Sequence, residues 1–304
     1  MQLNITSETS KLEVVILGIA DDFGGTPSAM DCYDPKSREN VINNTFPSQK
    51  DLINQVANLH QVLVKYDVNV IRPENIKSVN QIFSRDIAVV IEDRIFLPNI
   101  IKDRHKELDG ISSFLKQIPS EKILRMPKST RLEGGDVVLW KDYIFIGYSE
   151  EVEFEQYKVS RTNFAAIKYI QEHFPKKKVI KLELNKSDIE SKNNALHLDC
   201  CFQPIGNNHA ILCQDGFKNK KDVNFLLNLF GRENIIEVNS AEMNHMHCNL
   251  FSINSNVIIS EKNFTNLNSQ LREIGFVVEE VPYNEVGKMG GLFRCSTMPI
   301  KRRR

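Results

Sequence analysis

A recurring order of strands and helices constrains the fold of this 304-residue chain most strongly. Each copy combines a β-hairpin, an amphipathic helix and one further strand. In the clearest copy, residues 137–140 and 143–147 have the apolar pattern of a hairpin, 162–174 have helical spacing, and 178–184 form the last strand. A supersecondary unit that repeats at such intervals is typical of rings and solenoids.

The other copies follow the same order. Hairpins are predicted at 88–98, 200–213 and 250–260, helices at about 106–118, 222–230 and 265–274, and last strands at 122–126, 234–238 and 276–281. The first copy is less regular, with a strand at 12–19, a long polar loop at 21–45, a helix at 49–66 and a strand at 68–72. Residues 296–300 are expected to close the ring by pairing with the N-terminal strand. We therefore predict an α/β fold, a five-bladed ββαβ propeller, forming a single domain over 1–304.

Bulk composition excludes several classes of protein. Lys plus Arg and Asp plus Glu both number 39, so nothing indicates a nucleic-acid or membrane partner. The sequence has no apolar run of membrane-spanning length and no signal-peptide pattern. Six cysteines occur without a CxxC pair, which favours free thiols in a reducing cytoplasm. Cys200, Cys201 and Cys213 are expected to be buried in strands, and residues 301–304 to form a solvated basic tail.

Polar residues stand immediately before the predicted hairpins. They are Asp86, Asp136, Asp199 and Asn249, at intervals of 50 (136 − 86), 63 (199 − 136) and 50 (249 − 199). Cys295 follows 46 residues later (295 − 249), just before the expected closing strand. Equivalent positions in a ring face the same end of its axis. We therefore expect these residues, with Glu133 and His197, to converge in one central pocket.

Such a pocket contains the groups needed for nucleophilic catalysis. A cysteine attacks as its thiolate, a histidine within reach transfers protons, and a carboxylate such as Glu133 fixes the histidine tautomer. Asp86 and Asp199 then need a cationic partner, because unpaired buried charges are costly. A planar guanidinium suits two carboxylates, so the excess of acids predicts a guanidinium substrate.

Three motifs carry a resemblance to a known family. They are LEGGD at 132–136, HLD at 197–199 and GGLFRCST at 290–297, preceded by Arg85-Asp86. In this order they resemble the guanidine-modifying, or pentein, superfamily of arginine deiminases, dimethylargininases, agmatine deiminases and glycine amidinotransferases. The resemblance covers nearly the whole chain and implies a five-bladed α/β propeller.

The resemblance also implies roles for individual residues. Cys295 would attack the guanidinium carbon and form a covalent amidino-thioether, His197 would transfer protons, and Glu133 would orient His197. Asp86 and Asp199 would bind the guanidinium nitrogens, while Arg104 and Arg161 resemble positions that bind a substrate carboxylate. Asn249 would line the pocket or fix the backbone. An acid at 199 is unusual in dimethylargininases and favours an unsubstituted guanidinium.

Three functions remain open at this level. The leading one is an amidinohydrolase of deiminase type, acting on arginine or an arginine-like compound. The second is an amidinotransferase that passes the amidino group to an amine acceptor, and the third is a propeller that only binds a partner. No cofactor or metal is expected, since the cluster His245-x-His247-Cys248 lacks a fourth ligand at zinc-like spacing. The expected partner is a small guanidino molecule, and the sequence is compatible with a homodimer.

Overall fold

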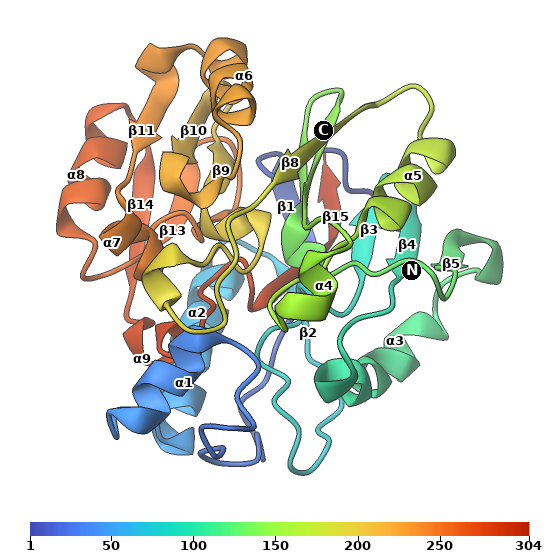
Figure 1. Cartoon of the computed structure of the whole chain (residues 1–304), viewed down its shortest axis with the longest axis vertical. Helices are drawn as coiled ribbons and strands as arrows, with labels where there is room; N and C mark the ends of the chain where they lie inside the picture. Colours follow the sequence, from blue (N-terminus) through green and yellow to red (C-terminus); the bar gives the residue numbers. More distant parts are fainter. Residues whose placement is uncertain (304) are drawn as a thin grey trace.

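Residues 1–303, which the computed structural model describes, form five three-stranded sheets. In every sheet two strands pair antiparallel and a third joins them in the parallel direction. Four sheets follow one another along the chain: β3 (Val89–Ile91), β4 (Arg94–Leu97) and β5 (Ile123–Arg125); β6 (Val137–Trp140), β7 (Tyr143–Tyr148) and β8 (Lys178–Glu183); β9 (Phe202–Ile205), β10 (His209–Leu212) and β11 (Ile235–Glu237); β12 (Phe251–Ser252), β13 (Val257–Glu261) and β14 (Val277–Val281). The predicted ββαβ propeller with five blades is confirmed (Figure 1).

The fifth sheet joins distant parts of the chain. It consists of β1 (Lys11–Leu17), β2 (Asn69–Ile71) and β15 (Thr297–Arg303), with β15 antiparallel to β1. The predicted closure of the ring is therefore confirmed. The expectation of a solvated basic tail is wrong for residues 301–303, because Arg302 is buried and donates to the carbonyls of Ser10 and Ser252. Arg304 lies outside the described residues.

The main helices lie outside the sheets, as Figure 1 shows for α5, α6 and α8. They are α2 (Gln49–Lys65), α5 (Phe164–His173), α6 (Lys220–Phe230) and α8 (Thr265–Glu273), each within two residues of the predicted bounds. Helix α2 begins where the Ser48 side chain accepts the Asp51 amide, and its buried stripe includes Leu52, Val56 and Leu59. Packing of such stripes against the sheets builds the core.

One predicted helix is wrong in type. A 3₁₀ helix at Lys102–Ile111, followed by the short α3 (Ser112–Leu115), stands in place of the helix predicted at 106–118. In a 3₁₀ helix side chains three residues apart share one side. This spacing lets Arg104 and Glu107 point inward together and form a bidentate ion pair at 2.8 Å.

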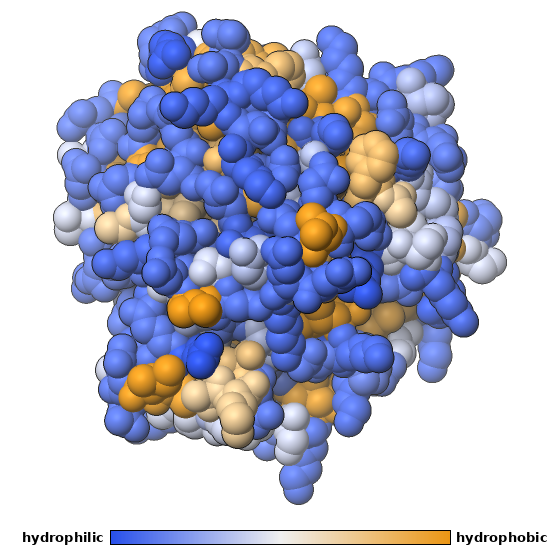
Figure 2. Space-filling view, viewed as in Figure 1, coloured by the Kyte–Doolittle hydropathy of each residue, from blue (hydrophilic) through white to orange (hydrophobic). Residues whose placement is uncertain are grey.

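Short helices occupy the connections. The loop at 21–45 contains α1 (Pro35–Ile42), which the sequence did not reveal, and α4 (Glu153–Gln156), α7 (Ser240–Asn244) and α9 (Asn284–Gly287) are each a single turn or slightly more. Figure 2 shows a mostly hydrophilic face with scattered hydrophobic side chains. Among the described residues, no helix is both long enough and apolar enough to cross a bilayer.

Candidate active site

The residues that precede the hairpins meet around the centre of the ring, as expected from their periodicity. Each is hydrogen-bonded to the next blade, so the contacts form a closed circuit. The circuit runs from Gly135 N to Asp86 Oδ1 (3.0 Å), from Leu198 N to Asp136 Oδ1 (2.9 Å), from Asn249 Nδ2 to the Asp199 carbonyl (3.4 Å), from Cys295 N to Asn249 Oδ1 (3.1 Å) and from Arg85 N to the Cys295 carbonyl (3.0 Å). All five blades therefore contribute to one site.

Cys295 is held between an amide and a carboxylate. Its Sγ accepts a hydrogen bond from Asn249 Nδ2 at 3.2 Å and donates to Asp199 Oδ2 at 3.8 Å. Asn249 Oδ1 also accepts the backbone amides of Leu292 and Cys295, so one side chain fixes the loop and the thiol together. Asn249 was predicted to line the pocket or fix the backbone. It contacts the Cys295 thiol and accepts two backbone amides.

His197 lies on the Glu133 side of the site. Its Nε2 is 2.9 Å from Glu133 Oε2, and its Nδ1 is 3.6 Å from Asp86 Oδ1. Nδ1 is buried without a hydrogen-bond partner. The Glu133 contact can fix the orientation of the ring, and it leaves Nδ1 available to exchange a proton with a bound molecule.

The carboxylates of the site already have cationic partners in the protein. Asp86 pairs with Arg104 at 2.6 Å, Glu133 with Arg161 at 2.8 Å and Asp199 with Arg294 at 2.7 Å. The premise that Asp86 and Asp199 lack a partner is therefore wrong, because the fold brings arginines distant in sequence against them. Their binding of a guanidinium stays a prediction that needs other support.

Arg104 and Arg161 are buried and donate hydrogen bonds to protein acceptors. Arg104 donates to Asp86, Glu107 and the Phe83 carbonyl. Arg161 donates to Glu133 and to the carbonyls of Lys158 and Tyr33. Both arginines therefore hold acids of the site, and their binding of a substrate carboxylate stays a prediction.

The electrostatic environment favours a charged imidazole and a neutral thiol. Burial alone would favour neutral His197, but the Asp86 carboxylate and the hydrogen bond to Glu133 raise the pKa of His197. Burial opposes ionisation of Glu133, yet Arg161 and His197 hold the pKa of Glu133 below its usual range. Burial, together with the Asp199 and Asp86 carboxylates, raises the pKa of the Cys295 thiol well above its ordinary value.

The turn around Gly135 brings these groups into close contact. A Cβ on Gly135 would lie 2.7 Å from His197 Nδ1 and 2.9 Å from Asp86 Oδ1. The next residue, Asp136, accepts the Thr162 hydroxyl at 2.6 Å and the Leu198 amide at 2.9 Å. Asp136 therefore positions the segment that carries His197, and Gly135 leaves room for the ring.

One group of side chains has the geometry of a cation site. Single ligand atoms of Asp86, Glu133 and His197 lie within 4.8 Å of one another. The guanidinium groups of Arg104 and Arg161 already pair with Asp86 and Glu133 in this group. In the sequence cluster His245-x-His247-Cys248, the His247 ring stacks on Phe264, with ring centroids 3.7 Å apart.

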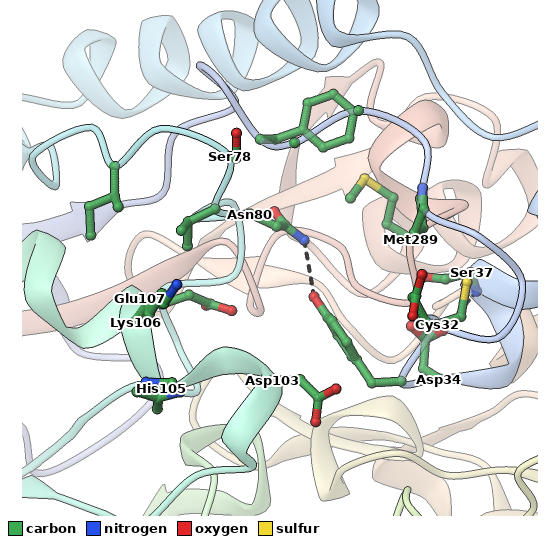
Figure 3. A pocket seen from close by; sticks show the side chains of 18 of the residues that line it. Cys32, Asp34, Ser37, Ser78, Asn80, Asp103, His105, Lys106, Glu107 and Met289 are labelled. Carbon is green, nitrogen blue, oxygen red and sulfur yellow. Dashed lines mark hydrogen bonds between the residues drawn. The ribbon is translucent and has the colours of Figure 1, made fainter.

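The catalytic candidates lie behind an outer cavity of about 600 Å³. Cys295 and His197 are only 3% and 1% exposed, and neither lines this cavity. Its lining includes Tyr33, Asn80, Glu107 and Met289. Asn80 donates a hydrogen bond to the Tyr33 hydroxyl at 3.3 Å, drawn as the dashed line from Asn80 in Figure 3. The Tyr33 carbonyl accepts a hydrogen bond from Arg161 at 2.6 Å, so the loop at 21–45 contacts the arginine that pairs with Glu133.

Three residues of the site were missed by sequence reasoning. Arg294 bridges Asp199 and the buried Glu8, at 2.7 and 3.0 Å. The position of Arg294 beside Cys295 was a usable signal, whereas Glu8 lies 286 residues away in sequence. Tyr33 was visible only as part of a long polar loop. Cys200, Cys201 and Cys213 are buried as expected, but none lies within a strand: the first two precede β9, and Cys213 follows β10.

Comparison with known proteins gives relatives of the same architecture. The uncharacterized protein YkgA of Bacillus subtilis (strain 168) is 29% identical over 223 residues, 73% of this chain and 70% of YkgA. The bifunctional arginine dihydrolase/ornithine cyclodeaminase AgrE of Nostoc sp. is 23% identical over 84% of this chain, which spans only 34% of that protein.

Solved structures show the same fold at low identity. The product-bound N-terminal domain of ArgZ, an arginine dihydrolase from Cyanobacteria, has a TM-score of 0.77 and 20% identity, covering 96% of this chain and 98% of the domain. SxtG, an amidinotransferase from Microseira wollei, has a TM-score of 0.77 and 16% identity over 99% and 98%. Residues 28–302 match the family model described as N,N dimethylarginine dimethylhydrolase, eukaryotic. This chain therefore belongs to the N,N dimethylarginine dimethylhydrolase family, within the superfamily of guanidine-modifying enzymes that its motifs resemble.

Proposed function

We propose that this chain is an amidinohydrolase that removes an amine from an arginine-like guanidino compound, with Cys295 as nucleophile. The observation that carries the proposal is the placement of the Cys295 thiol against Asp199 in a site whose imidazole is held by Glu133. A thiol, a proton carrier and two inward-facing carboxylates meet the needs of attack on a cationic carbon.

The charge around Cys295 orders the steps. With the thiol pKa raised by burial and by Asp199, the resting enzyme holds a neutral thiol. A guanidinium that enters beside Asp86 and Asp199 brings a positive charge, which favours the thiolate. Reactivity of Cys295 would thus develop when a cationic substrate is bound, and other electrophiles would be attacked slowly.

The proton transfers follow from the His197 environment. The Cys295 thiol releases its proton to solvent as the guanidinium binds, and the resulting thiolate forms a bond to the guanidinium carbon. The carbon–nitrogen bond to the leaving amine breaks as the protonated His197 gives that nitrogen a proton. The neutral imidazole then takes a proton from water, whose oxygen attacks the amidino-thioether carbon. The sulfur leaves, and the products are a ureido compound and an amine or ammonia.

The substrate we favour carries an unsubstituted guanidinium. The family description names dimethylarginine, and the relative AgrE is named an arginine dihydrolase. Asp86 and Asp199 are hydrogen-bond acceptors when ionised, and each methyl group on a guanidinium nitrogen replaces an N–H donor. Two carboxylates at one site therefore support arginine over its dimethylated form.

A substrate screen tests the proposal. Arginine, methylated arginines, agmatine and guanidinoacetate are incubated with the enzyme and with Cys295→Ser, and ureido product, free amine and ammonia are followed. Ureido product that disappears in Cys295→Ser supports the hydrolase. Turnover that requires an added amine such as glycine would mean an amidinotransferase, and the absence of turnover and of a Cys295 adduct would leave a binding protein.

A further inference from the structure

The outer cavity contains a buried carboxylate whose second oxygen has no partner. Asp34 is 5% exposed and lines the cavity beside Ser37 and Met289 (Figure 3). Its Oδ1 accepts the Ser37 amide at 2.8 Å and caps α1, while Oδ2 makes no hydrogen bond. A helix cap needs only one oxygen. The capping role therefore does not explain the orientation of the other oxygen.

Burial of an unpaired carboxylate costs free energy, and it makes the charged form less favourable. Burial raises the pKa of Asp34, and the hydrogen bonds from Ser37 and the charge of Arg161 only partly oppose that effect. A cation in the cavity would stabilise the charged form. Other acids face the same cavity, among them the buried Glu107 and the exposed Asp31 and Asp103. Glu107 is already bound to Arg104, so Asp34 is the cavity carboxylate in greatest need of a partner among the described residues.

Asp34 is also connected to the nucleophile through the glycine-rich loop. A Cβ on Gly290, whose φ is +81°, would lie 2.7 Å from Asp34 Oδ1, and a Cβ on Gly291 would lie 2.9 Å from Cβ of Cys295. Along this path the two side chains are no more than roughly 12 Å apart, taking ~3.8 Å between successive Cα atoms. An extended arginine covers roughly 7 Å from guanidinium carbon to ammonium nitrogen. With a carbon–sulfur bond at one end and a hydrogen bond at the other, a bound arginine fits within this upper limit.

We propose that Asp34 is a specificity-determining residue that binds the primary ammonium group at the far end of the guanidino substrate. The inference rests on the proposed function, because it places the guanidinium at Cys295. The Asp34 carboxylate accepts N–H donors of the ammonium through Oδ2 and keeps its cap on α1 through Oδ1. Substrate selection thus depends on the loop at 21–45 as well as on the blades.

The test compares substrates that differ only in the ammonium group. The pairs are arginine with 5-guanidinopentanoate, and agmatine with pentylguanidine. We expect the enzyme to prefer the ammonium-bearing member by roughly 10- to 100-fold in kcat/KM, the range of a hydrogen bond to a charged group. Asp34→Asn should remove most of this preference while it changes the ammonium-free partners by less than about threefold.

The choice of variants separates recognition from folding. Asn and Ser both cap helices well, so Asp34→Asn and Asp34→Ser should keep α1 intact. Glu39→Gln removes an exposed charge from the same helix outside the cavity and should leave the preference unchanged. An Asp34→Asn preference equal to that of the wild type, or an equal fall for both members of a pair, would overturn the subsite alone. Absence of turnover and of a Cys295 adduct with all four guanidines would overturn the proposed function, and the subsite with it.

Discussion

The Cys295 thiol donates to the Asp199 carboxylate, and this contact controls its ionisation. Asp199→Asn removes a negative charge beside the sulfur and releases the positive charge of Arg294, so the pKa of the thiol should fall. We expect the alkylation of Cys295 by iodoacetamide to become faster at neutral pH and its rate profile to move to lower pH. Peptide mass spectrometry at several pH values measures this.

The half-buried Cys32 gives an internal control in the same digest, because its alkylation rate should be equal in both proteins. An Asp199→Asn profile at higher pH than the wild type would contradict the assigned environment of Cys295.

Asn249 positions the nucleophile with both ends of its amide. Asn249→Ala removes the donor to Cys295 Sγ and the acceptor for two backbone amides. A hydrogen bond to a charged group contributes roughly 1.5–3 kcal/mol, so kcat/KM should fall by roughly 10- to 150-fold. Steady-state kinetics with the best guanidine of the screen measures the change. Asn207→Ala, in an exposed hairpin turn, is the matched control and should behave as wild type.

At the residue scale, the sequence predicted which side chains meet but not how they are paired. Asp86, Glu133 and His197 were predicted to converge because each stands shortly before a hairpin, and these positions are equivalent in a ring of blades. The ion pair between Arg294 and Glu8 joins residues at opposite ends of the chain, and no local pattern encodes it. The assumption of unpaired acids failed for this reason.

The closing strand β15 is rich in basic residues, yet its Arg302 is buried. Arg302→Ala removes hydrogen bonds to the carbonyls of Ser10 and Ser252 and a contact with the Phe251 ring. We expect the free energy of unfolding to fall by about 2–3 kcal/mol, as for lost hydrogen bonds of a charged group. Arg303→Ala, which breaks an exposed pair with Glu13, should change it by less than about 0.5 kcal/mol. Urea denaturation compares the two, and similar losses in both would show that Arg302 does not anchor the strand.

At the element scale, prediction succeeded where one physical period dominates. The hairpins β3–β4 and β6–β7 have apolar strands around two-residue turns, and α2 and α6 bury regular apolar stripes. The 3₁₀ segment was missed because its inward residues, Arg104 and Glu107, are charged and are buried only by pairing with each other and with Asp86. Helix α1 was missed because it is short and polar, with its N-cap at Asp34.

At the scale of the whole molecule, we propose that residues 1–304 form a single domain. Every blade contributes to the circuit of hydrogen bonds around Cys295, and β15 ties the two ends of the chain into one sheet. Unfolding should therefore be one cooperative transition. Fluorescence of Trp140, the single tryptophan, and far-ultraviolet circular dichroism should give coincident urea curves. Separated midpoints would indicate more than one folding unit.

The pairing of β15 with β1 has a consequence for the biosynthesis of the protein. Cys295 stands two residues before β15 (297 − 295), so it leaves the ribosome long after Glu133 and His197 have been made. The thiol reaches Asn249 and Asp199 only when β15 docks on β1, hundreds of residues away along the chain. Contacts of such long range require the closure of a large loop, so we expect this docking to be slow. We therefore expect a nascent or interrupted chain to lack a reactive Cys295.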